Sequence, residues 1–294
     1  MSKIIEREKG IIALIFVSLF FASMGIFARY LQFDFTILQQ TYLRVIAAFF
    51  LSIIFFYKDL HFQKFIQLSY REWVLLLFRA ITWYVIGVTF LSQAFITTVY
   101  SNVAFIESLP LTAFFGFLLL REKITFRKLI YVAIGFLGVV VIAVKDYSHL
   151  FTWGHGELFA LVSTIAFAIN YVSRKWQGET LNNKEIAIGM FFISGILLVA
   201  TSFFFHESLP RIESFSPFIG IILILAGAFN VMNVVLINFG FQKVEAVIAG
   251  NILMLEVLFA LAIGFLFFGE IPQVKDIAGG ILILFSAYMI NTLS

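Results

Sequence analysis

Ten runs of about twenty apolar residues follow one another along the chain, and no other feature constrains its fold as strongly. A helix of that length crosses the roughly 30 Å hydrocarbon core of a bilayer and satisfies its own backbone hydrogen bonds, which lipid cannot do. A content of 62% hydrophobic and only 13% charged residues agrees with this interpretation. We therefore expect an all-α integral membrane protein with ten transmembrane helices, at about residues 10–30, 36–57, 72–95, 97–120, 127–145, 155–174, 184–206, 215–240, 244–268 and 275–292.

Positive charges are distributed unequally over alternate loops. If the N-terminus is cytoplasmic, 14 Lys and Arg residues fall in inside segments and only four fall outside, namely Arg29, Lys145, Arg211 and Lys275. Cytoplasmic loops of membrane proteins carry an excess of Lys and Arg. The first run also resembles a secretory signal, but it is long for one and nine spans follow it. We expect a multi-pass protein with both termini in the cytoplasm.

Signatures of several other classes are missing from the sequence. The histidines lie in loops or at span ends, and there is no H-E-x-x-H, G-x-S-x-G or Walker motif. Cysteine is absent, which excludes disulfides and thiolate metal sites. Basic residues are spread over many loops instead of forming one patch, so nucleic acid is not an expected partner. We expect no catalytic residues, no metal and no cofactor, and hence a protein that is not an enzyme.

The chain resembles itself at a shift of about half its length. Residues Gly10–Tyr30 align with Gly156–Trp176 at a shift of 146, and REKI at 121–124 aligns with GEIP at 269–272 at a shift of 148. Five spans per half is an odd number, so the halves must cross the membrane in opposite senses. Inverted repeats are typical of secondary transporters. We predict two inverted five-helix repeats, at residues 1–147 and 148–294, which together form one membrane domain.

Four ionisable residues lie well inside predicted spans: Arg44, Arg79, Glu107 and Glu256. A charge facing lipid at mid-depth costs about 2.5–3.5 kcal/mol on insertion scales, so these side chains should face an interior. Glu107 and Glu256 occupy nearly equivalent places in the two halves, which predicts a central acidic site. Each carboxylate could bind a proton, bind a cationic group, or pair with an arginine, with Arg79 the expected partner of Glu107. The arginines could equally hold an anionic group of a substrate.

A proline follows Glu107 by three residues, in the segment IESLP. Pro110 cannot donate a backbone hydrogen bond, so we expect it to free the carbonyl of Ile106 and create a polar spot beside Glu107. Such a break at membrane depth is tolerated only where it lines a cavity. A kink that serves helix packing is the alternative.

Further polar and aromatic residues lie in the spans and complete the candidate substrate site. Hydrogen bonds between helices account for many such polar residues, and packing accounts for most aromatic ones. Those that could instead contact a ligand are Asn102, Asn230, Asn233, Trp83 and Tyr84.

Several segments together resemble the drug/metabolite transporter superfamily, and within it the ten-helix EamA-type transporters: YLRVIAA at 42–48, FRA at 78–80, PL at 110–111, LRE at 120–122 and FGE at 268–270. Arg121 stands where that family usually has glycine before the glutamate. The resemblance implies a permease in the cytoplasmic (inner) membrane of a prokaryote, and architectural roles for Glu122 and Glu270. The combination of Arg44, Arg79 and Pro110 is similar to the branch that carries S-adenosylmethionine, riboflavin and nucleotide-like metabolites.

The sequence therefore predicts a secondary active transporter that moves a small polar metabolite by alternating access, with protons as a candidate coupling ion. Amino acids, nucleotide-like compounds and S-adenosylmethionine-like compounds are the candidate solutes. The expected partners are that metabolite and membrane lipid, with the protein as a monomer or homodimer. The competing interpretation is a membrane protein without transport activity, such as a lipid-handling enzyme or an assembly subunit.

Overall fold

The computed structural model describes residues 2–98, 100–144, 154–269 and 271–293. Throughout these ranges the secondary structure consists of helices and connecting turns, without strands. Ten helical segments are long and apolar enough to cross a membrane, as predicted. Glu270, Lys145 and His149 lie outside the described residues.

The first five spans are α1 (Ser2–Leu31), α2 (Ile37–Phe56), α4–η1–α5 (Tyr70–Ala80, Ile81–Val88, Thr89–Thr97), α6–α7 (Tyr100–Glu107, Leu111–Leu120) and α8 (Phe126–Ala143). The second five are α9 (His155–Ser173) with η2 (Arg174–Trp176), α10 (Asn183–Phe204), α11 (Pro217–Lys243), α12–α13 (Ala246–Leu253, Leu255–Phe268) and α14 (Val274–Asn291). Two short helices, α3 (Phe62–Ile66) and η3 (Ile212–Ser214), lie in the connections after spans two and seven. The helix α1 begins well before the predicted residue 10, because its polar first turns continue the same helix.

Polar residues just ahead of the apolar runs determine where several spans begin. Thr36 and Asn182 accept backbone hydrogen bonds from the first turns of α2 and α10, and Gln39 and Glu185 return bonds to the caps. These reciprocal bonds satisfy donors that lipid would leave unpaired at a helix end. Thr36 and Asn182 are 146 residues apart, as are Gln39 and Glu185. The start of span two is therefore repeated at the start of span seven.

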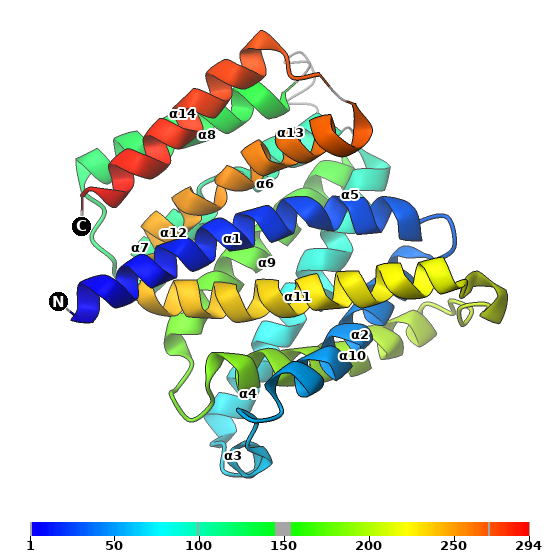
Figure 1. The fold of residues 1–294 in the computed structure, drawn as a ribbon. Coiled ribbons are helices and arrows are strands. Elements are labelled where there is room, and N and C mark those ends of the chain that lie inside the picture. Colours follow the sequence, from blue (N-terminus) through cyan, green and yellow to red (C-terminus); the bar gives the residue numbers. More distant parts are fainter. Residues whose placement is uncertain (1, 99, 145–153, 270, 294) are drawn as a thin grey trace.

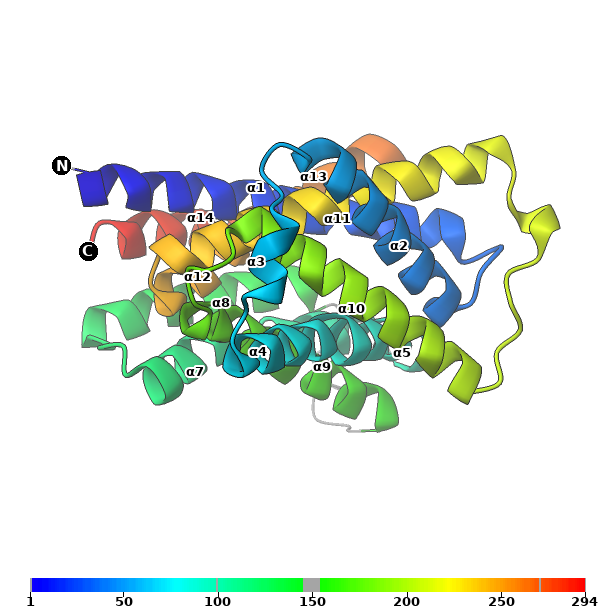
Figure 2. The same cartoon turned by 90° about the horizontal axis from the view of Figure 1, so that it is seen from below.

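Helix packing follows the repeat. The helix α8 packs along α14, and α2 along α10, so spans five and ten pair, as do spans two and seven (Figures 1 and 2). In the first half α1 contacts α11, α12 and α13, while its counterpart α9 contacts η1, α5, α6 and α7. Each contact of α1 with the second repeat thus has an equivalent contact of α9 with the first. The chain consists of two inverted five-helix repeats that interlock.

Both chain termini lie on one side of the bundle, next to each other (Figure 1). Arg7 Nη2 donates to Asn291 Oδ1 at 2.7 Å and to the Asn291 carbonyl at 3.1 Å, which joins the first and last helices. An even number of spans requires this arrangement. We call this face the terminal side and the opposite face the far side.

The pair α8 and α14 is held by a close approach of two glycines. A Cβ added at Gly138 would lie 2.6 Å from the carbonyl oxygen of Gly279, and one added at Gly279 would lie 2.6 Å from that of Gly138. In a membrane the hydrophobic effect does not drive helices together, so contacts of this kind between small residues supply the association. By contrast, Gly220 on α11 has no neighbouring atom within 4 Å of an added Cβ.

These contacts predict opposite effects of the same substitution at two glycines. Gly138→Ala should destabilise the protein by about 1–3 kcal/mol, because α8 and α14 must move apart. Gly220→Ala should be neutral or stabilising by up to about 1 kcal/mol, since alanine is the better helix former. Thermal unfolding of the purified variants in detergent measures both. Equal melting temperatures would contradict the close packing of α8 on α14.

Candidate functional site

Two spans, the fourth and the ninth, are interrupted near their middle. In span four α6 ends at Glu107 and α7 begins at Leu111. In span nine Met254 separates α12 from α13, with bonds from Met254 N to Asn251 O and from Val257 N to Met254 O in place of the regular pattern. Glu107 is the last residue of its half-helix and Glu256 the second residue of its own. Each carboxylate therefore lies at an interruption, one in each repeat.

The expected role of Pro110 needs correction. The carbonyl of Ile106 is not free, because it accepts the Leu109 N–H at 3.2 Å in a tight turn. Pro110 instead precedes α7 directly, where its missing N–H costs nothing. The second interruption, at Met254, forms without any proline.

Glu107 and Glu256 are partly exposed. Among the described residues neither side chain has an ion pair or a hydrogen bond. The two carboxylates lie within electrostatic reach of each other and of the Tyr171 hydroxyl on α9. Two acidic groups that are remote in sequence, one from each repeat, therefore act on each other electrostatically and have no described partner.

An aromatic wall borders this acidic pair. Tyr171 stacks on Phe241 of α11, with ring centroids 4.9 Å apart and planes inclined by 11°. Trp83 packs edge-on against Tyr171 at 5.5 Å and against Phe167 at 5.4 Å, and it stacks on Phe21 at 5.8 Å. Trp83 is 2% exposed, so its indole is a packed part of the wall. The wall joins helices α1, η1, α9 and α11.

The element that carries Trp83 and Tyr84 is a π-helix, Ile81–Val88, in the middle of span three. Its wider turn inserts an extra residue, and such segments are frequent at functional sites. Gly87 lies against the Phe167 ring, 2.6 Å from an added Cβ, and its carbonyl accepts the Ser163 hydroxyl at 2.8 Å. The π-helix is therefore fixed against α9, and the Tyr84 hydroxyl donates to Asn230 Oδ1 at 3.2 Å.

Arg79 does not pair with Glu107, contrary to expectation. Its guanidinium is 1% exposed and donates from Nη2 to Asn238 Oδ1 at 2.6 Å and, at 3.5 Å, to Asn170 Oδ1. Asn170 in turn donates to the Arg79 carbonyl at 2.7 Å and to the Thr82 hydroxyl at 2.9 Å. The partner was predicted from the span next in sequence, but α9 and α11 of the other repeat supply the side chains that contact Arg79. Arg79 is interior and does not extend toward the membrane surface.

Of the other predicted residues, Arg44 and Asn233 lie buried in α2 and α11, whereas Asn102 lies at an end of α6. Arg44 on α2 is 7% exposed, and its Nε donates to the Gln40 carbonyl of the same helix at 3.1 Å. Asn233 on α11 is 2% exposed and has no partner for Oδ1. Asn102 belongs to the far end of α6, where its amide donates to Glu157 at 2.8 Å. Glu157 also accepts the Gly154 N–H at 2.8 Å, so Asn102 stabilises helix ends.

Glu122, expected to be architectural, joins the repeats on the terminal side. Its carboxylate accepts the backbone N–H groups of Ala246 at 2.9 Å and Val247 at 3.3 Å, at the start of α12, and pairs with Lys175 at 2.7 Å. A carboxylate at a helix N-terminus satisfies orphan donors and complements the dipole. The loop after span four therefore caps span nine.

Sequence reasoning missed Asn170, Asn238 and Tyr171 as members of this centre. Asparagines in spans are common, and only the inverted packing of α9 and α11 shows which ones meet an arginine. No group of three potential metal ligands exists among residues 2–98, 100–144, 154–269 and 271–293.

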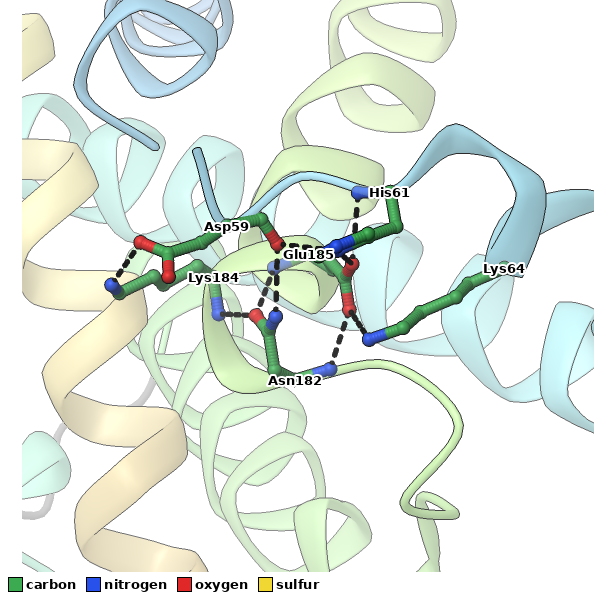
Figure 3. Close-up of polar contacts among 6 residues, drawn as sticks. All are labelled: Asp59, His61, Lys64, Asn182, Lys184 and Glu185. Carbon is green, nitrogen blue, oxygen red and sulfur yellow. Dashed lines mark hydrogen bonds and ion pairs between the residues drawn. The ribbon is translucent and has the colours of Figure 1, made fainter. Parts of the chain in front are cut away.

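The connection between spans two and three is bound to the start of α10 on the terminal side (Figure 3). The Glu185 side chain, fully buried, accepts the His61 N–H at 3.1 Å and the Asn182 N–H at 2.8 Å, and it pairs with Lys64 at 3.2 Å. Asp59 pairs with Lys184 at 2.5 Å. We call this ionic cluster the terminal-side latch.

A related contact lies on the far side, displaced by 146 residues in sequence. There the Thr36 hydroxyl donates to Glu207 at 2.9 Å, and Gln39 Nε2 donates to the Ser208 carbonyl at 2.7 Å. Gln39 takes the place of Glu185, and Glu207 that of His61. A hollow of about 320 Å³ adjoins this far-side latch, lined in part by Tyr42, Ser202 and Glu207. The far-side latch thus joins the start of α2 to the connection after α10, the equivalent place in the repeat, with fewer charges.

The terminal-side latch predicts a stability difference between two capping-box carboxylates. Glu185→Ala should destabilise the protein by about 2–3 kcal/mol, because it removes an ion pair and leaves the partly buried N–H groups of His61 and Asn182 without their acceptor. Asp276→Ala removes a capping carboxylate that accepts only the local Gln273 N–H in the described structure, at a cost of about 1 kcal/mol. Thermal unfolding compares the two. A smaller loss for Glu185→Ala than for Asp276→Ala would contradict the latch.

Comparison with known proteins agrees with this architecture. A model of the EamA-like transporter family matches residues 8–144 and again residues 154–292. An uncharacterized transporter of Archaeoglobus fulgidus is 27% identical over 206 residues, which cover 70% of each chain. A solved crystal structure at 13% identity superposes with a TM-score of 0.79 over 97% of this chain and 99% of its own, which shows a shared fold. The chain is therefore a member of the EamA-like transporter family.

Proposed function

We propose that this protein is a secondary active transporter that carries a small polar metabolite across the membrane by alternating access. One observation carries the proposal: the two interrupted spans place Glu107 and Glu256, one from each repeat, within electrostatic reach of each other and without a counter-ion among the described residues. Interrupted helices that meet between inverted repeats are where secondary transporters bind their solutes. The proposed site comprises Glu107, Glu256, Arg44, Arg79, Asn230, Asn233, Trp83 and Tyr84. Asn102, also predicted for the site, instead bonds Glu157 at the far-side end of α6.

The candidate solutes are amino acids, nucleotide-like compounds and S-adenosylmethionine-like compounds. The acidic pair favours a solute with a cationic group, and the wall formed by Trp83 and Tyr171 favours one with a flat or polarisable part. A proton is the proposed coupling ion, since two unpaired carboxylates at membrane depth can each exchange a proton for a cationic group. Proton and solute would then compete for the same oxygens.

The latches support the alternating part of the mechanism. One latch joins the connection after α2 to the start of α10 on the terminal side, and the other joins the start of α2 to the connection after α10 on the far side. Opening one while the other stays closed would expose the centre to each side in turn. The latches are therefore the proposed gates.

The proposed location is the cytoplasmic membrane of a prokaryotic cell, with both termini in the cytoplasm and the repeats divided between residues 147 and 148. Support comes from the loop charges, since 14 Lys and Arg residues fall in the segments predicted to be inside and four in those predicted to be outside. The proposed assembly is a monomer or a homodimer. Because the chain has no cysteine, a single cysteine added to any loop can be labelled without background to test the orientation.

The decisive variant is Glu107→Gln. Electrical currents from the purified protein in liposomes on a solid-supported membrane would be recorded after jumps in amino acids, nucleotides, S-adenosylmethionine and pH. Loss of one charge-assisted interaction, at about 1.5–3 kcal/mol, should lower the solute response about 10- to 100-fold. The melting temperature should not fall, because Glu107 has no described partner to lose. Glu213→Gln, at an exposed site in η3, is the matched control and should transport normally.

Two outcomes would oppose the proposal. If Glu107→Gln lowers the melting temperature and spares transport, Glu107 is structural. If folded wild-type protein gives neither a current nor isotope uptake with any solute, a membrane protein without transport activity is the better description.

A further inference from the structure

We propose that Arg79, together with Asn238 and Asn170, forms a subsite for an oxyanion, either a carboxylate or a phosphate group. This inference rests on the proposed function and deepens it, because it assigns the solute a negatively charged group held apart from the acidic pair.

The first evidence is a set of hydrogen-bond donors without acceptors. Arg79 Nε and Nη1 have no partner, and neither does Asn238 Nδ2, although Arg79 is 1% exposed and Asn238 fully buried. Only Nη2 of Arg79 is engaged. Buried polar groups are almost always hydrogen-bonded, so donors left together in this way need an acceptor. An oxyanion supplies several acceptor oxygens at once.

The second evidence is charge. Arg79 has no ion pair among the described residues, and the charge that acts on it is another cation, Arg174. A buried charge is costly unless it is paired. The unpaired nitrogens of Arg79 and Asn238 have almost no accessible surface in this conformation, so an acceptor reaches them only when the surrounding side chains move, and water in that place would leave the charge uncompensated. The asparagines position the guanidinium without neutralising it, so an anion is what the cluster lacks.

The third evidence is position. Asn170, which contacts Arg79, is followed on α9 by Tyr171, which lies within electrostatic reach of Glu107 and Glu256. Trp83, four residues after Arg79, packs on the same Tyr171 ring. The cationic cluster and the acidic pair therefore border one aromatic wall. A solute that carries both a cationic group and an oxyanion would compensate both.

Two asparagine-to-aspartate changes test the cluster without knowledge of the solute. Asn238→Asp places a carboxylate against Arg79 Nη2 and supplies the missing charge. Asn251→Asp makes the same change at another buried asparagine, 2% exposed, which bonds to Ser286 and to no arginine. Asn238→Asp should melt at or above the wild-type temperature, and Asn251→Asp several degrees below it. A loss in Asn238→Asp as large as that in Asn251→Asp would overturn the proposal.

A ligand arm uses sodium phosphate and sodium acetate against sodium chloride at equal ionic strength. Either oxyanion should raise the melting temperature of the wild type but not of Asn238→Asp, since a ligand stabilises only the protein that binds it. This result would indicate that a free anion occupies the subsite. If instead only a solute active in transport stabilises the wild type, and its methyl ester does not, the solute carries the oxyanion. Equal stabilisation of wild type and Asn238→Asp, or none by any of these ligands, would overturn the proposal.

The oxyanion subsite and the acidic site of the proposed function can be tested independently of each other. If Glu107→Gln transports normally while Asn238→Asp abolishes the response to oxyanions, the acidic site fails and the oxyanion subsite stands. The reverse pattern leaves the acidic site and removes Arg79 from solute binding.

Discussion

The structure depends above all on the need to satisfy every backbone hydrogen bond inside lipid. That requirement makes each of the ten spans helical and makes any interruption of a span costly. The two interruptions at Ser108–Pro110 and Met254 are therefore informative, because each occurs at membrane depth and each adjoins a carboxylate. A helix of the other repeat covers each interruption: α9 packs against α6 and α7, and α1 packs against α12 and α13. The same constraint explains the capping boxes at Thr36 and Asn182, and the use of Glu122 to complete the start of α12.

Because the two repeats are related by inverted symmetry, several local features of the first repeat have counterparts in the second. A helix start, a break and a loop contact in the first repeat each have a counterpart about 146 residues later, on the opposite side of the membrane or at the same depth. Glu107 and Glu256 are such counterparts near the middle of their spans, and the two latches are such counterparts at the ends of the spans. The repeats are not copies in detail. Arg121 adopts a left-handed conformation, with φ of 55°, where the second repeat has Gly269 at 66°. Arginine pays a steric cost of roughly 1–2 kcal/mol there that glycine avoids.

Apolar runs and self-similarity were sufficient to predict the ten spans and the two inverted repeats, whereas the central site of Glu107 and Glu256 stays a prediction. These features are periodic or compositional, so they can be read along one chain. The partners of Arg79 could not be predicted, because Asn170 and Asn238 come from spans that become its neighbours only after the repeats interlock. The π-helix at Ile81–Val88 has no marker in its residues, and the turn at Met254 lacks the proline that signals a break. The predicted Arg79–Glu107 pair is absent for the same reason. It was inferred from adjacent spans, whereas contacts between the two repeats determine the partners of Arg79.

The unequal latches have a consequence for the resting protein. The terminal-side latch contains two ion pairs and a buried carboxylate, whereas its far-side equivalent relies on an amide, a hydroxyl and Glu207. Conformations that differ by about 1.4 kcal/mol differ tenfold in population. If the latches act as the proposed gates, the unloaded carrier would favour the conformation closed toward the side of its own termini, and its return would require these salt bridges to break. Its turnover would then rise with ionic strength, because salt weakens partly exposed ion pairs such as that of Lys184 with Asp59.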